Sequence, residues 1–205
     1  MEQNLRETIG QDIFDYQMLM NALKEYVSPR DKITRLLKSG EIIQLRKGLY
    51  IFHQAYRKQS LSREIIANMI YGPSYISFEY ALSYYGIIPE RVNVVTSAAL
   101  GRTRSYDTPL GVFSYRMLPA DVFSIGVDIV ESFHIATPAK ALADKVAYDS
   151  NLGIRTAAGM ADYLQAGLRA DVSDIDLSEL AGIGQAYRMT KIKLLEDAVR
   201  RIKDE

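Results

Sequence analysis

The apolar residues of Ser28–Phe52 change their spacing midway, and that change predicts a helix followed by a hairpin. Ile33, Leu36 and Leu37 recur at intervals of three and four residues, which places them on one buried stripe of a helix. Ser28 precedes this stripe as a candidate N-cap, and a proline follows it at the first helical position, where a missing N–H costs nothing. The helix should therefore begin just after Ser28.

The hairpin that follows is predicted from two short apolar runs. Ser39–Gly40 ends the helix, and strands are expected at about Glu41–Arg46 and Leu49–Phe52. A tight turn at Lys47–Gly48 joins them, because glycine tolerates the positive φ that such turns require. A basic helix followed by a hairpin with a basic tip is typical of a winged helix–turn–helix. That domain inserts the helix into the major groove of DNA and sets the wing on the backbone.

Similar patterns organise the rest of the chain into two domains. A helix at about 15–25 precedes the basic one, residues 1–12 suggest another, and the polar segment YRKQS ends a first domain at residue 58. Further helices are predicted at 62–71, 77–85, 137–150, 156–168, 177–186 and 190–203, and strands at 92–97, 111–118 and within 127–135, with a polar loop at 101–108. The predicted class is α+β. A winged helix–turn–helix (1–58) precedes a larger α+β domain (59–205) with a small, mainly antiparallel sheet and a helical C-terminus.

Charge is unevenly distributed, although the chain as a whole is neutral. Nine basic and three acidic residues lie between Lys24 and Lys58, a net charge of +6, so the remainder carries −6. Such asymmetry is typical of a DNA-contacting module attached to a neutral or acidic domain. The candidate DNA-binding residues are polar or basic residues of the helix and hairpin: Arg30, Lys32, Thr34, Arg35, Lys38, Gln44, Arg46 and Lys47.

These candidates are expected to play different parts. Arg35 and Thr34 are best placed for base edges, since arginine can pair bidentately with guanine. The three lysines and Arg46 are expected at phosphates, which hold the protein in register but read no sequence. Gln44 either reaches the groove or faces solvent. A solvated helix with ordinary surface lysines is the alternative, and the hairpin that follows the helix favours DNA binding over it.

Several classes of protein are disfavoured by composition. The chain has no cysteine, which excludes disulfides, thiolate metal sites and cysteine nucleophiles and fits a reducing compartment. The first twenty residues lack the features of a signal peptide, and no apolar run approaches the roughly 18–20 residues of a membrane span. We therefore expect a cytoplasmic protein that does not bind a membrane.

Residues that could carry catalysis are sparse. His53 and His134 each lie beside apolar or aromatic residues, which favours structural roles. Asp121, Asp128 and Glu131 are reminiscent of a metal-dependent nuclease, but no lysine follows at the expected spacing, and a turn with a strand edge is the simpler interpretation. The HExxH, phosphate-loop and GxSxG motifs are absent. We expect no enzymatic activity, cofactor, metal or small-molecule substrate, with a divergent nuclease as a minor alternative.

Two further features allow two interpretations each. The tyrosines within Tyr71–Tyr85 form either a packed interface between the domains, which is favoured, or a partner-binding surface. Arg102, Arg104 and Tyr106 belong either to a solvated loop, the default interpretation, or to a second electropositive site for DNA or an acidic partner.

Several segments together resemble one family. They are GLYIF, YGPSYISFEYALSYYGIIPE, VNVVTSA, GRTRSYDTPLGVFSYRML and ATPAKALADKV. These segments resemble the AbiEi-type antitoxins of type IV toxin–antitoxin systems over about residues 15–150, and Gly72–Glu90 is the most specific part. By this resemblance Ser28–Lys38 corresponds to the recognition helix and Glu41–Phe52 to the wing. Ala139 occupies a position where the family commonly has an acidic residue.

The resemblance also implies a function. Members of the AbiEi-type family repress their own operon by binding inverted repeats in double-stranded operator DNA. Their second domain helps to neutralise a nucleotidyltransferase-type toxin. Regulators of this type also occur without an evident toxin. A lone regulator and a protein-interaction module without DNA binding are therefore the alternatives.

Overall fold

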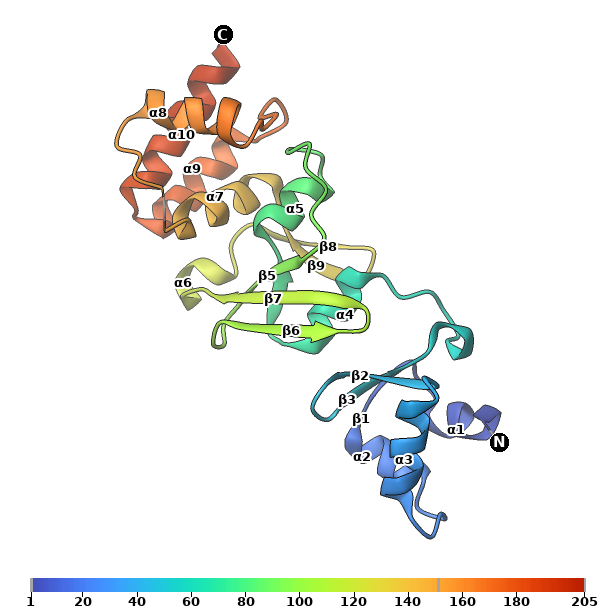
Figure 1. Cartoon of the computed structure of the whole chain (residues 1–205). Helices are drawn as coiled ribbons and strands as arrows, with labels where there is room; N and C mark the ends of the chain where they lie inside the picture. The colour runs from blue at the N-terminus through green and yellow to red at the C-terminus, as the bar shows by residue number, and fades with distance from the viewer. Residues whose placement is uncertain (1, 151, 205) are drawn as a thin grey trace.

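The computed structural model describes residues 2–150 and 152–204, which form two α+β units (Figure 1). The N-terminal unit contains α1 (Glu2–Ile9), β1 (Ile13–Asp15), α2 (Tyr16–Ala22), α3 (Pro29–Lys38), β2 (Ile42–Arg46) and β3 (Leu49–Phe52), followed by a 3-10 turn at Gln54–Tyr56. Its three strands pair antiparallel in the order β1-β3-β2. One face of this sheet and the three helices enclose a separate hydrophobic core.

The helix and hairpin predicted from the sequence are confirmed. α3 ends at Lys38, just before Gly40 with a φ of +74°, and Gly48 turns the hairpin with a φ of +81°. One detail of the prediction is wrong, because the Ser28 side chain makes no capping hydrogen bond. The proline at the first helical position is therefore the local signal that starts this helix.

Strand β1 was not predicted. Its residue Phe14, which immediately precedes the helix predicted at about 15–25, pairs with Tyr50 in the sheet and packs against Phe52, with the ring centroids 4.6 Å apart. A strand of only three residues is too short to show the alternation of apolar and polar residues by which strands are recognised.

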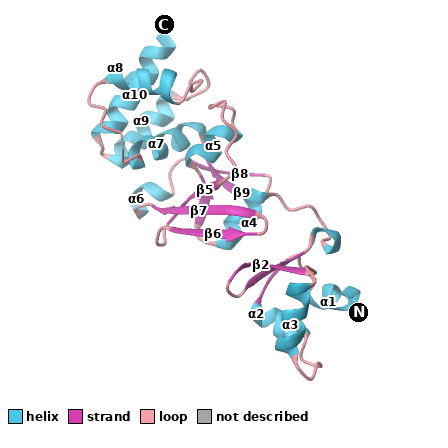
Figure 2. Ribbon diagram, viewed as in Figure 1, coloured by secondary structure: helices cyan, strands magenta, loops and turns pink. Residues whose placement is uncertain are grey.

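The second unit is a sheet of six strands with helices on its faces and a helical C-terminus (Figure 2). Its elements are α4 (Arg63–Ile70), β4 (Ser74–Ile76), α5 (Phe78–Tyr84), β5 (Val95–Ala99), β6 (Arg104–Thr108), β7 (Gly111–Met117), α6 (Ala120–Phe123), β8 (Val127–Val130), β9 (Phe133–Ala136), α7 (Pro138–Tyr148), α8 (Ala157–Asp162), a π-helical turn (Tyr163–Gly167), α9 (Leu177–Tyr187) and α10 (Thr190–Asp204).

The topology of this sheet is mixed. The strand order is β6-β7-β5-β4-β9-β8, with parallel pairing of β5 with β7 and of β4 with β9 and antiparallel pairing elsewhere. The sequence predicted a small, mainly antiparallel sheet and a loop at 101–108. Residues Arg104–Thr108 of the predicted loop form the edge strand β6. This strand was not predicted because only Thr108 of its five residues is buried. The C-terminal helix predicted at 190–203 is α10, and its apolar stripe closes the core, since Ile192, Leu195 and Val199 are fully buried.

The two units pack against each other directly. Ile13, Leu45 and Ile51 lie on the outer face of the three-stranded sheet and belong to the core of the second unit. Nε of Arg46 donates a hydrogen bond to the carbonyl of Ile70, 2.6 Å away. Side chains from both units thus share one core, and the hairpin is held against the second unit.

Candidate nucleic-acid interface

The outer face of α3 carries four of the eight predicted DNA-binding residues. Arg30, Thr34 and Lys38 follow at intervals of four residues, so they form one stripe along the helix, and all three are exposed. Arg35 is exposed beside this stripe. The opposite face is anchored by Ile33 and Leu36, which are 6% and 1% exposed, so the cationic face is fixed toward solvent.

Local contacts distinguish two of the predicted residues on α3. The Thr34 hydroxyl donates to the carbonyl of Arg30 at 3.1 Å, which leaves its oxygen as an acceptor only. Nζ of Lys32 lies 5.9 Å from the ring centroid of Tyr26, a cation–π contact that turns Lys32 away from the stripe. Lys32 is half-buried, whereas Arg35 and Lys38 are exposed.

The hairpin places its candidates in two environments. Lys47 is exposed at the tip, next to Gly48. Gln44 is exposed and lies opposite Tyr50 on the sheet; burial raises the pKa of Tyr50, and a hydrogen bond with Gln44 opposes that shift. Arg46 is exposed, but its guanidinium bonds the Ile70 carbonyl and, at 3.2 Å, that of Lys47. Arg46 therefore helps to fix the hairpin, a role the sequence did not predict.

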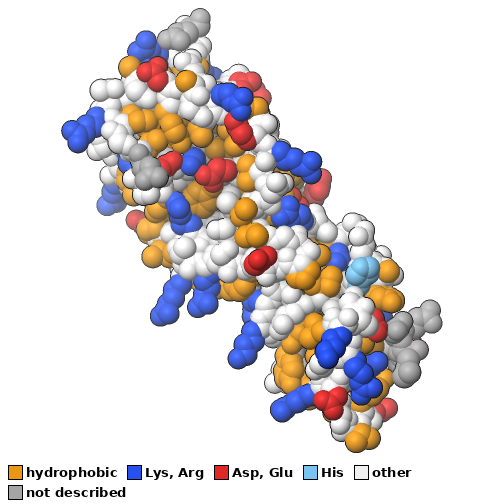
Figure 3. Space-filling view, in the orientation of Figure 1, with side chains coloured by type: hydrophobic (Ala, Val, Ile, Leu, Met, Phe, Trp, Pro, Cys, Tyr) orange, Lys and Arg blue, Asp and Glu red, His pale blue; other side chains and the backbone are white. Residues whose placement is uncertain are grey.

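The distribution of cations is visible on the surface of the molecule. Figure 3 shows Lys and Arg side chains over α3 and the hairpin, and others that project from the nearby border of the second unit. α3 lies on the side of the N-terminal unit that faces away from the second unit (Figure 1). Lys and Arg side chains over α3 and over the hairpin are visible together on this face of the molecule (Figure 3).

The candidates for catalysis lie apart and are exposed. The His53 side chain caps the 3-10 turn by accepting a hydrogen bond from the backbone N–H of Ala55. The backbone N–H of His134 donates a hydrogen bond to the side-chain oxygen of Asn68 at 2.6 Å. Within residues 2–150 and 152–204, no three His, Cys, Asp or Glu side chains gather closely enough to hold a metal ion. In the same ranges, no helix combines the length and the apolar character that crossing a bilayer requires.

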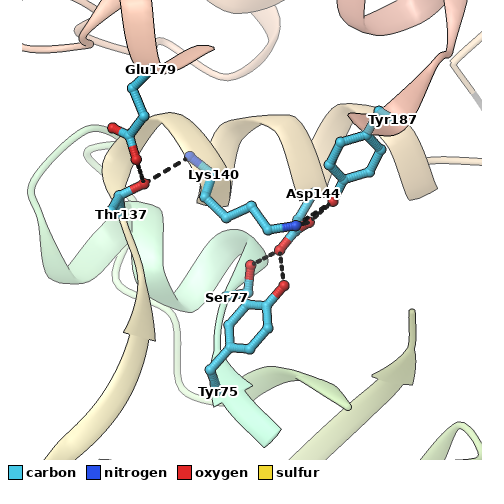
Figure 4. A network of polar contacts seen from close by, with 7 residues as sticks. All are labelled: Tyr75, Ser77, Thr137, Lys140, Asp144, Glu179 and Tyr187. Carbon is cyan, nitrogen blue, oxygen red and sulfur yellow. Dashed lines mark hydrogen bonds and ion pairs between the residues drawn. The ribbon is translucent and has the colours of Figure 1, made fainter. Parts of the chain in front are cut away.

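A buried polar network in the second unit was missed by sequence reasoning (Figure 4). Lys140 and Asp144 on α7 are both completely buried, and their charged atoms lie 2.8 Å apart. Asp144 also accepts hydrogen bonds from the hydroxyls of Tyr75, Ser77 and Tyr187. The network therefore ties the sheet, α7 and α9 together, and the only trace of it in the sequence is the four-residue spacing of Lys140 and Asp144.

The electrostatics of this network follow from its burial. Burial lowers the pKa of Lys140, and the attraction of Asp144 opposes that shift. Burial raises the pKa of Tyr75 and of Tyr187, and the Asp144 carboxylate raises both further. The tyrosines therefore stay protonated as donors to Asp144. Because the ion pair has no access to solvent, the network supports the fold and does not present a reactive group.

A polar hollow of about 230 Å³ lies beside the end of α7. Lys145 lines it and forms ion pairs with Glu79 at 2.8 Å and Asp149 at 3.0 Å. Burial lowers the pKa of Lys145, but these two hydrogen-bonded carboxylates outweigh that effect and raise it. Lys145 is therefore a paired cation and not a candidate general base.

Most of the predicted tyrosine group packs inside the second unit. Tyr75 is 1% exposed in the polar network, and Tyr71 packs against Tyr106 and Tyr115. Tyr84 is the exception, with 41% of its surface exposed.

No protein-family model matches the chain, and no curated protein matches it either.

Proposed function

We propose that the protein is a DNA-binding transcriptional repressor that recognises double-stranded operator DNA through a winged helix–turn–helix at its N-terminus. The observation that carries this proposal is the exposed cationic face of α3, which is followed along the chain by the β2–β3 hairpin with an exposed lysine at its tip. Both sit on a unit whose buried side holds them in place.

The order of elements supports a winged helix–turn–helix. Residues 2–52 run helix, strand, helix, helix, strand, strand, and the hairpin β2–β3 completes a sheet ordered β1-β3-β2. In a domain of this kind the helix before the hairpin is the one that enters the major groove, and the hairpin contacts the adjacent backbone. α3 has the position, the charge and the exposure that this role requires.

The proposed mechanism assigns different tasks to these residues. Arg35 and Thr34 face base edges, with Arg35 suited to the two acceptors of a guanine. Arg30, Lys38 and Lys47 contact phosphates and fix the register of α3 in the groove. If about five phosphates are neutralised, the logarithm of the affinity should fall with the logarithm of salt at a slope near −4 to −5.

The test is a mobility-shift titration on duplex DNA from the region upstream of the gene. Arg35→Ala should cost about 1–3 kcal/mol and relax specificity at one base pair, whereas Lys47→Ala should weaken all sequences alike. Lys193→Ala, an exposed lysine of α10, is the matched control and should bind like the wild type. Equal binding by the wild type and an Arg35→Ala/Lys47→Ala double variant would reject the proposal.

The resemblance to AbiEi-type antitoxins adds a protein partner to this proposal. We infer that the protein represses its own operon and that its second unit neutralises a nucleotidyltransferase-type toxin. Ile129 supports a protein partner, since it is 71% exposed on the edge strand β8. Co-purification with the product of a neighbouring nucleotidyltransferase gene is the expected result. DNA binding without such a partner would identify a lone regulator instead.

A further inference from the structure

Four exposed cations lie on the hairpin and at the start of β6, two segments in contact across the two units, and we call them the cationic edge. Its members are Arg46 and Lys47 of the hairpin and Arg102 and Arg104 at the start of β6. The chain carries no Asp or Glu within residues 46–48 or 101–106, so no carboxylate from these segments offsets the charge. Figure 3 shows Lys and Arg side chains that project along this border from both units.

Contacts at Tyr71 place the two parts of the cationic edge side by side. Arg46 bonds the carbonyl of Ile70, and Cζ of Arg104 lies 5.9 Å from the ring centroid of the next residue, Tyr71. Two arginines from segments far apart in sequence therefore meet at neighbouring residues. Because the units also share a core through Ile51, the relative position of these arginines is fixed.

The segment that carries Arg102 is held in place, unlike a solvated loop. A Cβ added at Gly101 would collide with the Tyr71 hydroxyl and ring, so only glycine allows this close approach. The Thr103 hydroxyl accepts a hydrogen bond from the backbone N–H of Met117 at 3.1 Å. Arg104 then enters the sheet opposite Tyr115. Arg102 is thus presented from a backbone that is anchored on both sides.

We propose that Arg102 and Arg104 contact phosphates of the same duplex that α3 and the hairpin tip bind, so that the DNA footprint extends onto the second unit. This inference rests on the proposed DNA-binding function. A duplex presents one negative charge about every 1.7 Å along its axis, so DNA seated at the hairpin tip brings phosphates to the adjoining arginines. Phosphate contacts position a protein without reading sequence, so these arginines strengthen binding and leave specificity unchanged.

The experiment measures the salt dependence of affinity for an upstream duplex with full-length protein. Arg102→Ala/Arg104→Ala is compared with the wild type and with Arg91→Ala/Lys193→Ala, which removes the same charge from exposed positions elsewhere. Each lost phosphate contact should reduce the log–log slope by about 0.9, so the first variant should lose about 2 in slope. The control should keep the wild-type slope, and circular dichroism should show that both variants are folded.

The outcomes separate this inference from the proposed function. If the wild type binds DNA and both double variants show the same slope of log affinity against log salt as the wild type, the inference is overturned. The binding surface would then be limited to α3 and the hairpin tip. Equal losses in the two double variants would also overturn it, because net charge alone would then explain the effect. A wild type that binds no duplex would instead reject the proposed function itself.

Discussion

Replacement of Asp144 by asparagine tests the energetic importance of the buried network. The change keeps the shape of the side chain but leaves the Lys140 ammonium, which is completely buried, without its counter-ion. Removal of one partner from a buried ion pair typically costs about 3–5 kcal/mol. We expect a loss of about that size in the free energy of unfolding, measured by urea denaturation at pH 7.

Comparison variants separate the buried charge from the carboxylate itself. Glu196→Gln breaks an ion pair with Arg200 that has the same spacing on a helix, but the Arg200 side chain is 58% exposed. That variant should lose at most about 0.5 kcal/mol. Lys140→Met should cost less than Asp144→Asn, because the carboxylate would keep its three hydroxyl donors. The double variant should be more stable than the sum of the two single losses predicts.

The pH dependence of the Asp144→Asn variant provides the decisive test. Burial already lowers the pKa of Lys140 below its usual value of 10.5, and the loss of Asp144 lowers it further. Between the lowered pKa of Lys140 in the folded variant and its usual pKa in the unfolded chain, the unfolded chain binds more protons than the folded one. The stability of the variant should therefore rise with pH toward 10. A deficit below about 1 kcal/mol, or one that does not shrink as pH rises, would refute this reasoning.

Two further changes test the packing between the units and the start of a helix. Ile51→Ala, at a fully buried position in the core that the two units share, should cost about 2–5 kcal/mol in calorimetry or denaturation, and a loss under 1 kcal/mol would contradict a shared core. Ser62→Ala removes the hydroxyl that accepts the Ile65 N–H at 3.2 Å and should cost about 1 kcal/mol. Ser28→Ala removes no cap and should be nearly neutral, so equal losses at the two serines would be inconsistent with the structure.

Local signals account for the parts of the fold that were predictable. The proline at the start of α3 and the glycines at 40 and 48 determine the backbone conformation of their immediate neighbours. The ends of α3 and the hairpin turn can therefore be predicted from the sequence. The strands β1 and β4 have three residues each, too few for a periodic pattern. β6 is polar because it is an edge strand, and its pairing with β7 depends on the hairpin and not on its own composition.

The candidate site could be predicted only where it depends on residues close together in the sequence. The cationic face of α3 follows from helical spacing, and its exposure agrees with that spacing. The role of Arg46 could not be predicted, because its partner Ile70 lies 24 residues further along the chain. The same holds for Asp144, whose hydroxyl donors come from residues 43 to 69 positions away. Such contacts depend on the tertiary fold, which periodicity within one element does not encode.

The central claim is sequence-specific DNA binding by α3 and the hairpin tip, and a competition measurement tests it most directly. The affinity of the wild-type protein is measured by fluorescence anisotropy for an upstream duplex and for a duplex of the same length and composition in scrambled order, at one salt concentration. The upstream duplex should bind at least about 10³-fold more tightly than the scrambled one. Equal affinities for the two duplexes, or no binding to either, would contradict it.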